Sequence, residues 1–242
     1  MVIVKDPVAV MQRYELKYIL TAWQEEFFRR RLEGHMKEDR FGLTSIASLY
    51  YDTPDRRLIN ASLEGQLFKE KIRLRSYGLA TDTSPVFLEL KRKAYGVVYK
   101  RREQSTIPVV RRFFDRERDG CADGQIDREL TWFRDRYGTL VPACLIICDR
   151  TAFYEPDGDL RLTIDNSPRY RTEQLDLRVS MEGSPLLPPG SSILEIKVQN
   201  AVPLWLSAIL TEGGIRKSSF SKYGAAYHRQ MQNTYRKDPC YV

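Results

Sequence analysis

The sequence has few of the residues from which metal and redox centres are usually built. Its 242 residues include four cysteines and two histidines, and no two cysteines have the CxxC spacing. Structural zinc sites draw their ligands from such pairs, so the sequence offers no zinc site. We expect the cysteines to be buried or unreactive thiols in a reducing compartment; they are Cys121, Cys144, Cys148 and Cys240.

Long hydrophobic runs are also missing. No stretch approaches the ~20 apolar residues that span a bilayer, and the opening MVIVKDPVAV lacks the basic start and long apolar core of a secretory signal. We therefore expect a soluble, cytoplasmic protein with no membrane segment in this chain, which is compatible with a partner in a membrane. With 42% hydrophobic residues, residues 1–242 are long enough to form a single domain with its own core.

Neither sign of charge dominates the composition. Lysine and arginine total 39, aspartate and glutamate total 32, and the net charge is +7. This balance differs from a simple cationic arm and favours an anionic partner that is bound at a local site. Nucleic acid is not expected to be that partner, because no RNP motif, zinc finger or recognition helix is found.

What the sequence does contain is a recurring alternation of charged and apolar residues. The segments RYELKYIL, KIRLRSY, VFLELKRK, LRLTID and SILEIKVQ each place charged side chains on one face if they are strands. The same alternation in VVYKRRE predicts that Tyr99, Arg101 and Glu103 share the polar face. Taken one strand at a time, the pattern is also that of an antiparallel sheet with one face in water.

Taken together, the polar faces favour a closed barrel. They carry both signs of charge and little Ser, Thr, Asn or Gln, whereas a solvated face is more mixed. In a barrel the apolar face would point outward under amphipathic helices, which we expect near residues 21–34, after 53, and near 125–137, 203–212 and 221–234. A charged lumen is costly unless ions fill it. A polyanion with a divalent cation would do so, because Lys and Arg bind phosphate oxygens and carboxylates bind the metal.

The order and content of these segments resemble a known family. From RYELKYIL through SLYYDTPD, KIRLRSYG, FLELKRK, DRTAFY, LRLTID and ILEIKVQ to FSKYGAAY, the chain resembles the triphosphate tunnel metalloenzymes, and within them the VTC (vacuolar transporter chaperone) domain of polyphosphate polymerases. The resemblance implies an α+β fold in which a closed, eight-stranded antiparallel β-barrel forms a tunnel with a charged lumen and helices packed on the outside. It also implies that the tunnel binds a nucleoside triphosphate and moves phosphoryl groups with Mn²⁺ or Mg²⁺.

The same resemblance assigns roles to individual residues. It implies that phosphate is held and transferred by Arg73, Arg75, Arg150, Arg161 and Lys222, that substrate is also bound by Lys17, Lys91, Lys71, Lys197 and Ser221, and that metal is bound by Glu195, Glu15 and Glu89. Ser221 and Lys222 match the family's Ser-Lys pair, where a helix N-terminus can add backbone N–H groups. Alternatives stay open for several of them. Glu15 and Glu89 could form structural ion pairs with Lys17 and Lys91, whereas Arg13, Lys71, Lys93 and Lys197 could steer anions at the tunnel mouths.

One departure from the superfamily bears on the reaction. Arg13 stands where the ExExK motif has its first Glu, so one metal ligand is missing and the lumen is shifted toward binding more phosphate. This favours a polyphosphate polymerase that takes ATP or another nucleoside triphosphate as donor, with polyphosphate and pyrophosphate as further ligands. The attacking phosphate is already ionised at neutral pH and needs no general base. A metal-dependent triphosphatase, with water activated by Glu15 or Glu89, and a non-catalytic polyphosphate-binding module are the alternatives.

Overall fold

The computed structural model of the chain describes residues 14–95, 97–117, 120 and 124–237. Arg13, Cys121 and Cys240, which figured in the sequence analysis, lie outside the described residues. The strands are β1 (Tyr14–Leu20), β2 (Lys37–Glu38), β3 (Thr44–Asp52), β4 (Phe68–Tyr77), β5 (Val86–Ala94), β6 (Val97–Ser105), β7 (Val141–Tyr154), β8 (Arg161–Arg171), β9 (Ser184–Pro185), β10 (Ser192–Val198) and β11 (Lys217–Ser218). The helices are α1 (Ala22–Leu32), α2 (Arg57–Leu63), α3 (Ile107–Phe114), α4 (Gln125–Tyr137), α5 (Leu204–Glu212) and α6 (Lys222–Lys237).

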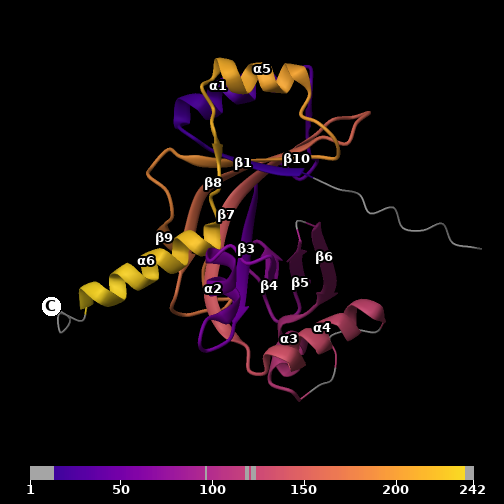
Figure 1. The fold of residues 1–242 in the computed structure, drawn as a ribbon, viewed down its shortest axis with the longest axis vertical. Helices are drawn as coiled ribbons and strands as arrows, with labels where there is room; N and C mark the ends of the chain where they lie inside the picture. The colour runs from indigo at the N-terminus through magenta and orange to yellow at the C-terminus, as the bar shows by residue number, and fades with distance from the viewer. Residues whose placement is uncertain (1–13, 96, 118–119, 121–123, 238–242) are drawn as a thin grey trace, which may run out of the picture.

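The strands form one curved antiparallel sheet. Hydrogen-bonded neighbours follow the order β11, β1, β10, β8, β7, β3, β4, β5, β6, while β2 pairs with β7 and β9 pairs with β8. Figure 1 shows α1 and α5 over β1 and β10, and α3 and α4 at the opposite end of the molecule, next to β4, β5 and β6. The expected α+β class, with a large antiparallel sheet and helices on its outside, is therefore confirmed.

The alternating pattern of the strands explains why the helices lie on the outside. Leu74, Leu88 and Ile147 belong to a buried cluster with Phe113 of α3 and Phe133 of α4. On the other half of the sheet, a second cluster joins residues of β1, β8 and β10 to α1 and α5, among them Leu162, Leu194, Phe28 and Leu206. Each fully buried apolar side chain of this kind contributes about 1.5–3 kcal/mol. The apolar face of the sheet is thus buried under helices, and the charged face points inward.

The sheet does not close into the barrel that the sequence predicted. The eight long strands, β1, β3–β8 and β10, are all present, but among the described residues no pairing joins β6 to the β1 end of the sheet. The far edge of β1 is paired at Lys17 and Tyr18 with β11 instead. Backbone groups that already bond β11 are not available to β6. The alternation in the sequence specified the faces of the strands correctly, but it carried no information on which edges would meet.

The start of α2 also differs from the expectation. The sequence analysis expected this helix directly after residue 53, whereas it begins at Arg57. Asp52 is fully buried, and its carboxylate accepts hydrogen bonds from the backbone N–H groups of Leu58 and Ile59 at 2.9 and 3.0 Å. A carboxylate satisfies the free N–H groups of a first turn better than a hydroxyl, and Asp52 therefore fixes α2 beside the end of β3.

A third buried cluster brings α6 to the sheet. Tyr50 of β3 and Ile146 of β7 pack with Ile59 of α2 and with Tyr223 and Ala226 of α6. This contact places the first residues of α6 beside the inner, charged face (Figure 1). No helix in the described part of the chain combines the length and the apolar composition needed to cross a membrane.

Candidate functional site

Charged side chains from strands β1, β4–β8 and β10 and from α6 meet on the inner face of the sheet. We call this set the charged cluster; its members, linked by the ion pairs and electrostatic contacts given below, are Glu15, Lys17, Lys71, Arg73, Arg75, Glu89, Lys91, Lys100, Arg102, Arg150, Asp165, Glu195, Lys197 and Lys222. Cations outnumber carboxylates in the cluster by more than two to one. An ordinary surface of mixed charge does not gather such an excess, because the uncompensated charges repel one another.

Glu195 lies at the centre of one half of the cluster. Its carboxylate is 3.3 Å from Lys222 Nζ, 3.6 Å from Lys17 Nζ and 4.0 Å from Arg150 Nη2. Arg150 binds Asp165 with two hydrogen bonds of 2.5 and 2.7 Å, and Lys222 also pairs with Asp165. Burial would raise the pKa of Asp165, but Lys222 and Arg150 lower it to about 2. Burial likewise opposes ionisation of Glu195, whose pKa Lys222 and Lys17 hold well below its usual value.

Glu89 organises the other half of the cluster. It is buried and lies between β4 and β6, with oxygens 2.7 Å from Arg73, 3.7 Å from Arg75, 2.9 Å from Lys100 and 3.6 Å from Arg102. Burial would raise the pKa of Glu89, but Arg73, Arg75 and Lys100 lower it to about 2. A single carboxylate therefore holds four cations of two strands in place.

Tyr50 also belongs to this half of the cluster. The sequence analysis did not predict it as a site residue. Its hydroxyl accepts a 2.9 Å hydrogen bond from Arg73 Nη1, and its ring stacks on Tyr223 at a centroid distance of 4.6 Å. Burial would raise the pKa of Tyr50, but the nearby charges of Arg73 and Lys71 lower it. Tyr223 in turn donates a 3.0 Å hydrogen bond to Asp52. The cap of α2 is thereby connected to a cationic side chain of the cluster.

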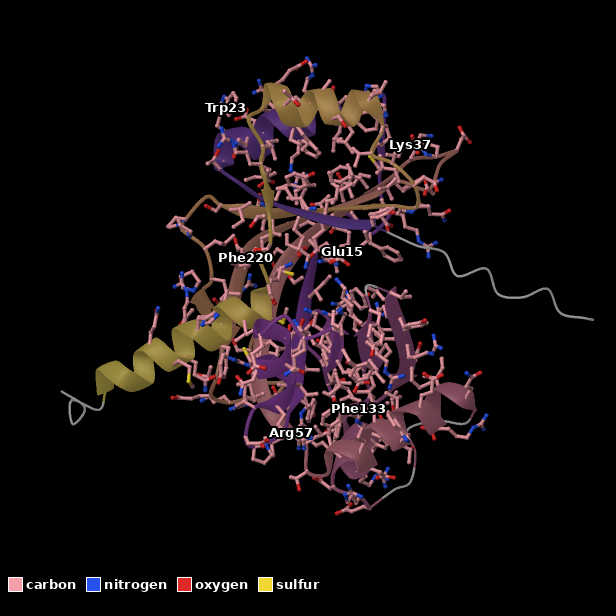
Figure 2. All side chains as sticks on the ribbon, in the orientation of Figure 1. Glu15, Trp23, Lys37, Arg57, Phe133 and Phe220 are labelled. Atoms are coloured by element: carbon pink, nitrogen blue, oxygen red, sulfur yellow. The ribbon has the colours of Figure 1, made fainter. Side chains whose placement is uncertain are left out.

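The two halves meet across the ends of the sheet. Glu15 of β1 is 3.1 Å from Lys91 of β5 and 3.2 Å from Lys17, and Figure 2 shows Glu15 on the side of β1 that faces β5 and β6. Burial would raise the pKa of Glu15, but Lys91 lowers it to about 2. The sheet is therefore curled enough for β1 and β5 to interact through side chains, although their backbones do not pair.

Two partly buried lysines of the cluster have a lowered pKa. Desolvation lowers the pKa of Lys71 and of Lys197. Lys197 has Glu195 at 4.0 Å, whereas the closest polar contact of Lys71 in the described structure is the Ser221 hydroxyl at 3.5 Å. Ser221 also accepts the backbone N–H of Gly224 at 3.2 Å, so it caps the first turn of α6. Lys71 is thus a cation whose charge the protein itself does not balance with a contacting carboxylate.

Arg161 is the one assigned cation that lies apart from the cluster in the described structure. It is exposed, its Nη1 donates to the carbonyl oxygens of Leu160 and Glu155 at 3.1 and 3.4 Å, and its guanidinium lies over Tyr154. These contacts hold it at the turn between β7 and β8. Its phosphate-binding role stays a prediction.

The inner face of β6 was assigned wrongly from the sequence. Arg101 contacts Glu129 of α4 on the outside at 3.0 Å, while its neighbours Lys100 and Arg102 point inward to Glu89. Residues 99–103 are all polar or amphipathic, so alternation alone could not tell the two faces apart. The antiparallel register that sets Arg102 opposite Glu89 decides it, because opposed residues share a face.

A divalent metal would find oxygen atoms on Glu15, Asp165 and Glu195, but these residues do not form a ready metal site. Each of the three carboxylates contacts at least one lysine or arginine. In the part of the chain that the structure describes, no three His, Cys, Asp or Glu side chains are grouped so as to hold a metal. The set of donors therefore does not fit a metal that is bound by the protein alone.

Two other features of the described structure could contain reactive groups: the buried cysteines and a cavity beside α1. Cys144 and Cys148 are free and buried, as expected, and burial raises their pKa values to about 12 and about 11. A cavity of about 620 Å³ lies between α1 and residues 183–191, but its Glu25, Arg29 and Asn166 bind one another. The charged cluster is therefore the candidate site.

Comparisons with known proteins show which family and which folds the chain is similar to. A family model described as the VTC domain matches residues 12–230, and no curated protein matches the chain. A solved structure from Bacillus halodurans, described as a candidate adenylate cyclase, is 14% identical, covers 87% of this chain and 94% of its own, and has a TM-score of 0.50. This likeness concerns the fold alone.

Two further solved structures are similar over comparable lengths. A candidate adenylate cyclase from Vibrio parahaemolyticus is 13% identical, with a TM-score of 0.48 over 90% of this chain and 98% of that chain. A protein from Hippeastrum, described as a candidate adenylyl cyclase with a dominant triphosphatase activity, is 16% identical, with a TM-score of 0.49 over 88% and 93%.

Proposed function

The chain belongs to the VTC domain family, as its sequence indicated, and on that premise we propose that it is a polyphosphate polymerase. The charged cluster binds a nucleoside triphosphate, with ATP as the expected donor in the cytoplasm, and transfers the terminal phosphoryl group to a growing polyphosphate chain. The observation that carries the proposal is the excess of cations over carboxylates on the inner face. A polyanion is the ligand that neutralises such a set.

Arg73 and Lys71 are the cations best prepared to receive phosphate. A guanidinium has five N–H donors; those of Arg73 that face Glu89 and Tyr50 are used, and the others remain for the ligand. Because both protein contacts fix the plane of the guanidinium, a phosphate oxygen meets donors that need little reorganisation. Lys71, which no carboxylate contacts in the described structure, adds a charge beside them.

The reaction depends on positioning and charge stabilisation more than on acid–base catalysis. An oxygen of the acceptor phosphate forms a bond to the γ-phosphorus, the bond from that phosphorus to the β,γ-bridging oxygen breaks, and the nucleoside diphosphate leaves with the electron pair. Arg73, Arg75 and Arg150 stabilise the charge that spreads over the transferred group. The attacking oxygen is already ionised at neutral pH, so no residue has to remove a proton.

The carboxylates of the cluster support transfer to phosphate over hydrolysis. A general base works best when its pKa lies near the working pH. Glu15 and Glu89, the residues that would activate water in a triphosphatase, both have a pKa of about 2 because of their cationic neighbours. At that pKa they are weak bases toward water, and the polymerase reaction does not need them.

A bound polyanion would also bring the two ends of the sheet together. Glu15 and Lys91 already meet across the ends of the sheet. Phosphates that contact Lys17 from β1 and Lys91 from β5 would hold the two ends together. In this proposal the charged face forms a tunnel around the anion, and residues 1–242 act as a single domain.

The reaction products test the proposal. Purified protein is incubated with ATP and, in separate samples, Mn²⁺ or Mg²⁺, and the products are resolved by gel electrophoresis and ³¹P NMR. Long phosphate chains formed together with ADP are expected. Orthophosphate as the sole phosphate product would establish the triphosphatase instead, and binding of tripolyphosphate without turnover of ATP would establish a binding module.

A further inference from the structure

The position that a metal would take between two carboxylates is filled by a lysine. We propose that Lys17 acts as an exchangeable cation between Glu15 and Glu195, so that a divalent metal binds only together with the phosphate anion that draws Lys17 away. The proposal deepens the proposed function, since it states how metal and triphosphate are coupled at the same site. It also resolves the poor fit between the carboxylates and a metal bound by the protein alone.

The geometry around Lys17 carries the proposal. Its Nζ is 3.2 Å from a Glu15 oxygen and 3.6 Å from a Glu195 oxygen, and Lys17 lies opposite Glu195 in the pairing of β1 with β10. An ammonium group is a compact point charge on a flexible stem. Mg²⁺ binds oxygen atoms at about 2.0–2.1 Å. To bind it, Glu15 and Glu195 would have to move in around the position that Lys17 Nζ takes. Ammonium and metal therefore exclude each other.

Lys17 is also free to leave. Its side chain is 28% exposed, whereas that of Lys222, which also contacts Glu195, is 14% exposed. The second partner of Lys222 is Asp165, whose side chain is fully buried, whereas the second partner of Lys17 is Glu15, whose side chain is 30% exposed, so the ammonium of Lys222 is the more enclosed of the two. An exposed ammonium on a four-carbon stem can turn from a carboxylate to a phosphate oxygen without a change in the backbone.

The charge of the whole cluster sets the order of binding. Lys91 and Lys197 also contact these carboxylates, at 3.1 Å from Glu15 and 4.0 Å from Glu195. A free divalent cation would add positive charge to a set already in excess. A bound triphosphate reverses the local sign, takes Lys17 as a partner and leaves Glu15 and Glu195 for the metal. Coupling of this kind is reciprocal, so the metal must also tighten the anion.

Equilibrium dialysis tests this order without any turnover. Wild-type protein is dialysed against MnCl₂ alone, against tripolyphosphate alone with EDTA, and against both ligands, and manganese and phosphate retained with the protein are measured. We expect tripolyphosphate to bind without metal and Mn²⁺ to be retained only when tripolyphosphate is present. Retention of one Mn²⁺ per protein from MnCl₂ alone, as strong as with the anion, would overturn the proposal.

The variant Lys17→Met gives the sharper test because it should gain a property. Without the ammonium, Glu15 and Glu195 are free to bind Mn²⁺, and retention from MnCl₂ alone should increase at least about tenfold. The matched control is Lys91→Met, which removes the same charge from Glu15 but leaves Lys17 in place and should gain no such binding. Adding Glu195→Gln to Lys17→Met should abolish the gain.

Each result separates this proposal from the proposed function. Thermal unfolding by circular dichroism verifies that the variants are folded, and the wild-type dialysis decides the proposal if Lys17→Met does not fold. Equal Mn²⁺ retention by folded Lys17→Met and Lys91→Met would refute the role of Lys17. Metal binding that depends on tripolyphosphate in a protein that makes no polyphosphate would uphold this inference and refute the polymerase. Polyphosphate synthesis by a protein that retains Mn²⁺ without tripolyphosphate would uphold the polymerase and refute this inference.

Discussion

The two halves of the charged cluster use carboxylates in different ways. On the side of β1, β8, β10 and α6, three carboxylates share several lysines. Glu195 by itself has four lysine or arginine contacts, at 3.3 to 4.0 Å. On the side of β4, β5 and β6, Glu89 fixes two arginines at 2.7 and 3.7 Å. Lysine is an adaptable point charge and arginine a rigid fork. The first half is therefore suited to exchanging cations and the second to holding phosphate in a set geometry.

The largest effect is expected in the half that holds phosphate. Arg73→Met removes a preorganised donor while keeping much of the side-chain volume, and should lower kcat/KM for polyphosphate synthesis by about 10²–10³-fold, as for other charge-stabilising donors. The measurement is the initial rate of ATP consumption with Mn²⁺. Arg111 on the outside pairs with Asp176, so Arg111→Met is the matched control and should change the rate less than twofold. Equal losses in both variants would place the chemistry outside the cluster.

Replacing a glutamate in each half should separate the two roles. Glu195→Gln should raise the Mn²⁺ concentration needed for half-maximal rate by about tenfold or more, as loss of interactions at metal sites commonly does. Glu89→Gln should leave that concentration unchanged, and should instead lower the rate at every Mn²⁺ concentration and the free energy of unfolding by about 1–3 kcal/mol, because it leaves buried cations without a partner.

Metal titrations of the rate and urea unfolding curves provide these two measurements. An increase in the Mn²⁺ requirement of Glu89→Gln as large as that of Glu195→Gln would show that Glu89 is a metal ligand. It would also remove the distinction between the two halves of the cluster.

Much of this arrangement could be read from the sequence, because alternation fixes the face of a strand. RYELKYIL places Glu15 and Lys17 together on a face opposite Leu16 and Leu20, and both leucines pack with the cluster under α1 and α5. The same reasoning placed Arg73 and Arg75 inside. These strands have one apolar face, so only one of their two orientations buries it.

The rest depended on tertiary contacts that no local pattern contains. Tyr50 and Tyr51 are adjacent aromatic residues, and their faces are distinguished by tertiary contacts: Tyr51 stacks on Phe114 of α3 at 4.0 Å, whereas Tyr50 contacts Arg73 on the inner face. Lys17 and Glu195 are far apart in the sequence, and their contact follows from the pairing of β1 with β10. The open edge of the sheet could not be predicted from the sequence either. Alternation specifies the faces of a strand, but it does not specify which edges pair.

Acid should destabilise the fold through both halves of the charged cluster, since carboxylates with a lowered pKa stabilise the fold when they are ionised. Glu15, Glu89 and Asp165 have pKa values of about 2 in the folded protein, against about 4.3 for Glu and 3.9 for Asp in unfolded chains. Their stabilisation is complete above the unfolded values and is lost as the pH falls toward 2. Urea midpoints of the ligand-free protein should therefore fall steadily between about pH 5 and pH 2. A midpoint constant over this range would show that these ion pairs add nothing to stability.

The smallest effect tests the face of β6, where two adjacent cations point in opposite directions. Lys100 contacts Glu89 inside at 2.9 Å and Arg101 contacts Glu129 outside at 3.0 Å, so Lys100→Met and Arg101→Met remove the same charge one residue apart. The inner variant should weaken tripolyphosphate binding about fivefold, close to the ~1 kcal/mol of one partly exposed ion contact, and the outer variant should leave the Kd unchanged. Calorimetric titration measures both. Long-range attraction by net charge alone would weaken both variants equally, because it does not distinguish the faces of a strand. A difference confined to Lys100→Met therefore requires direct contact between the anion and the inner face.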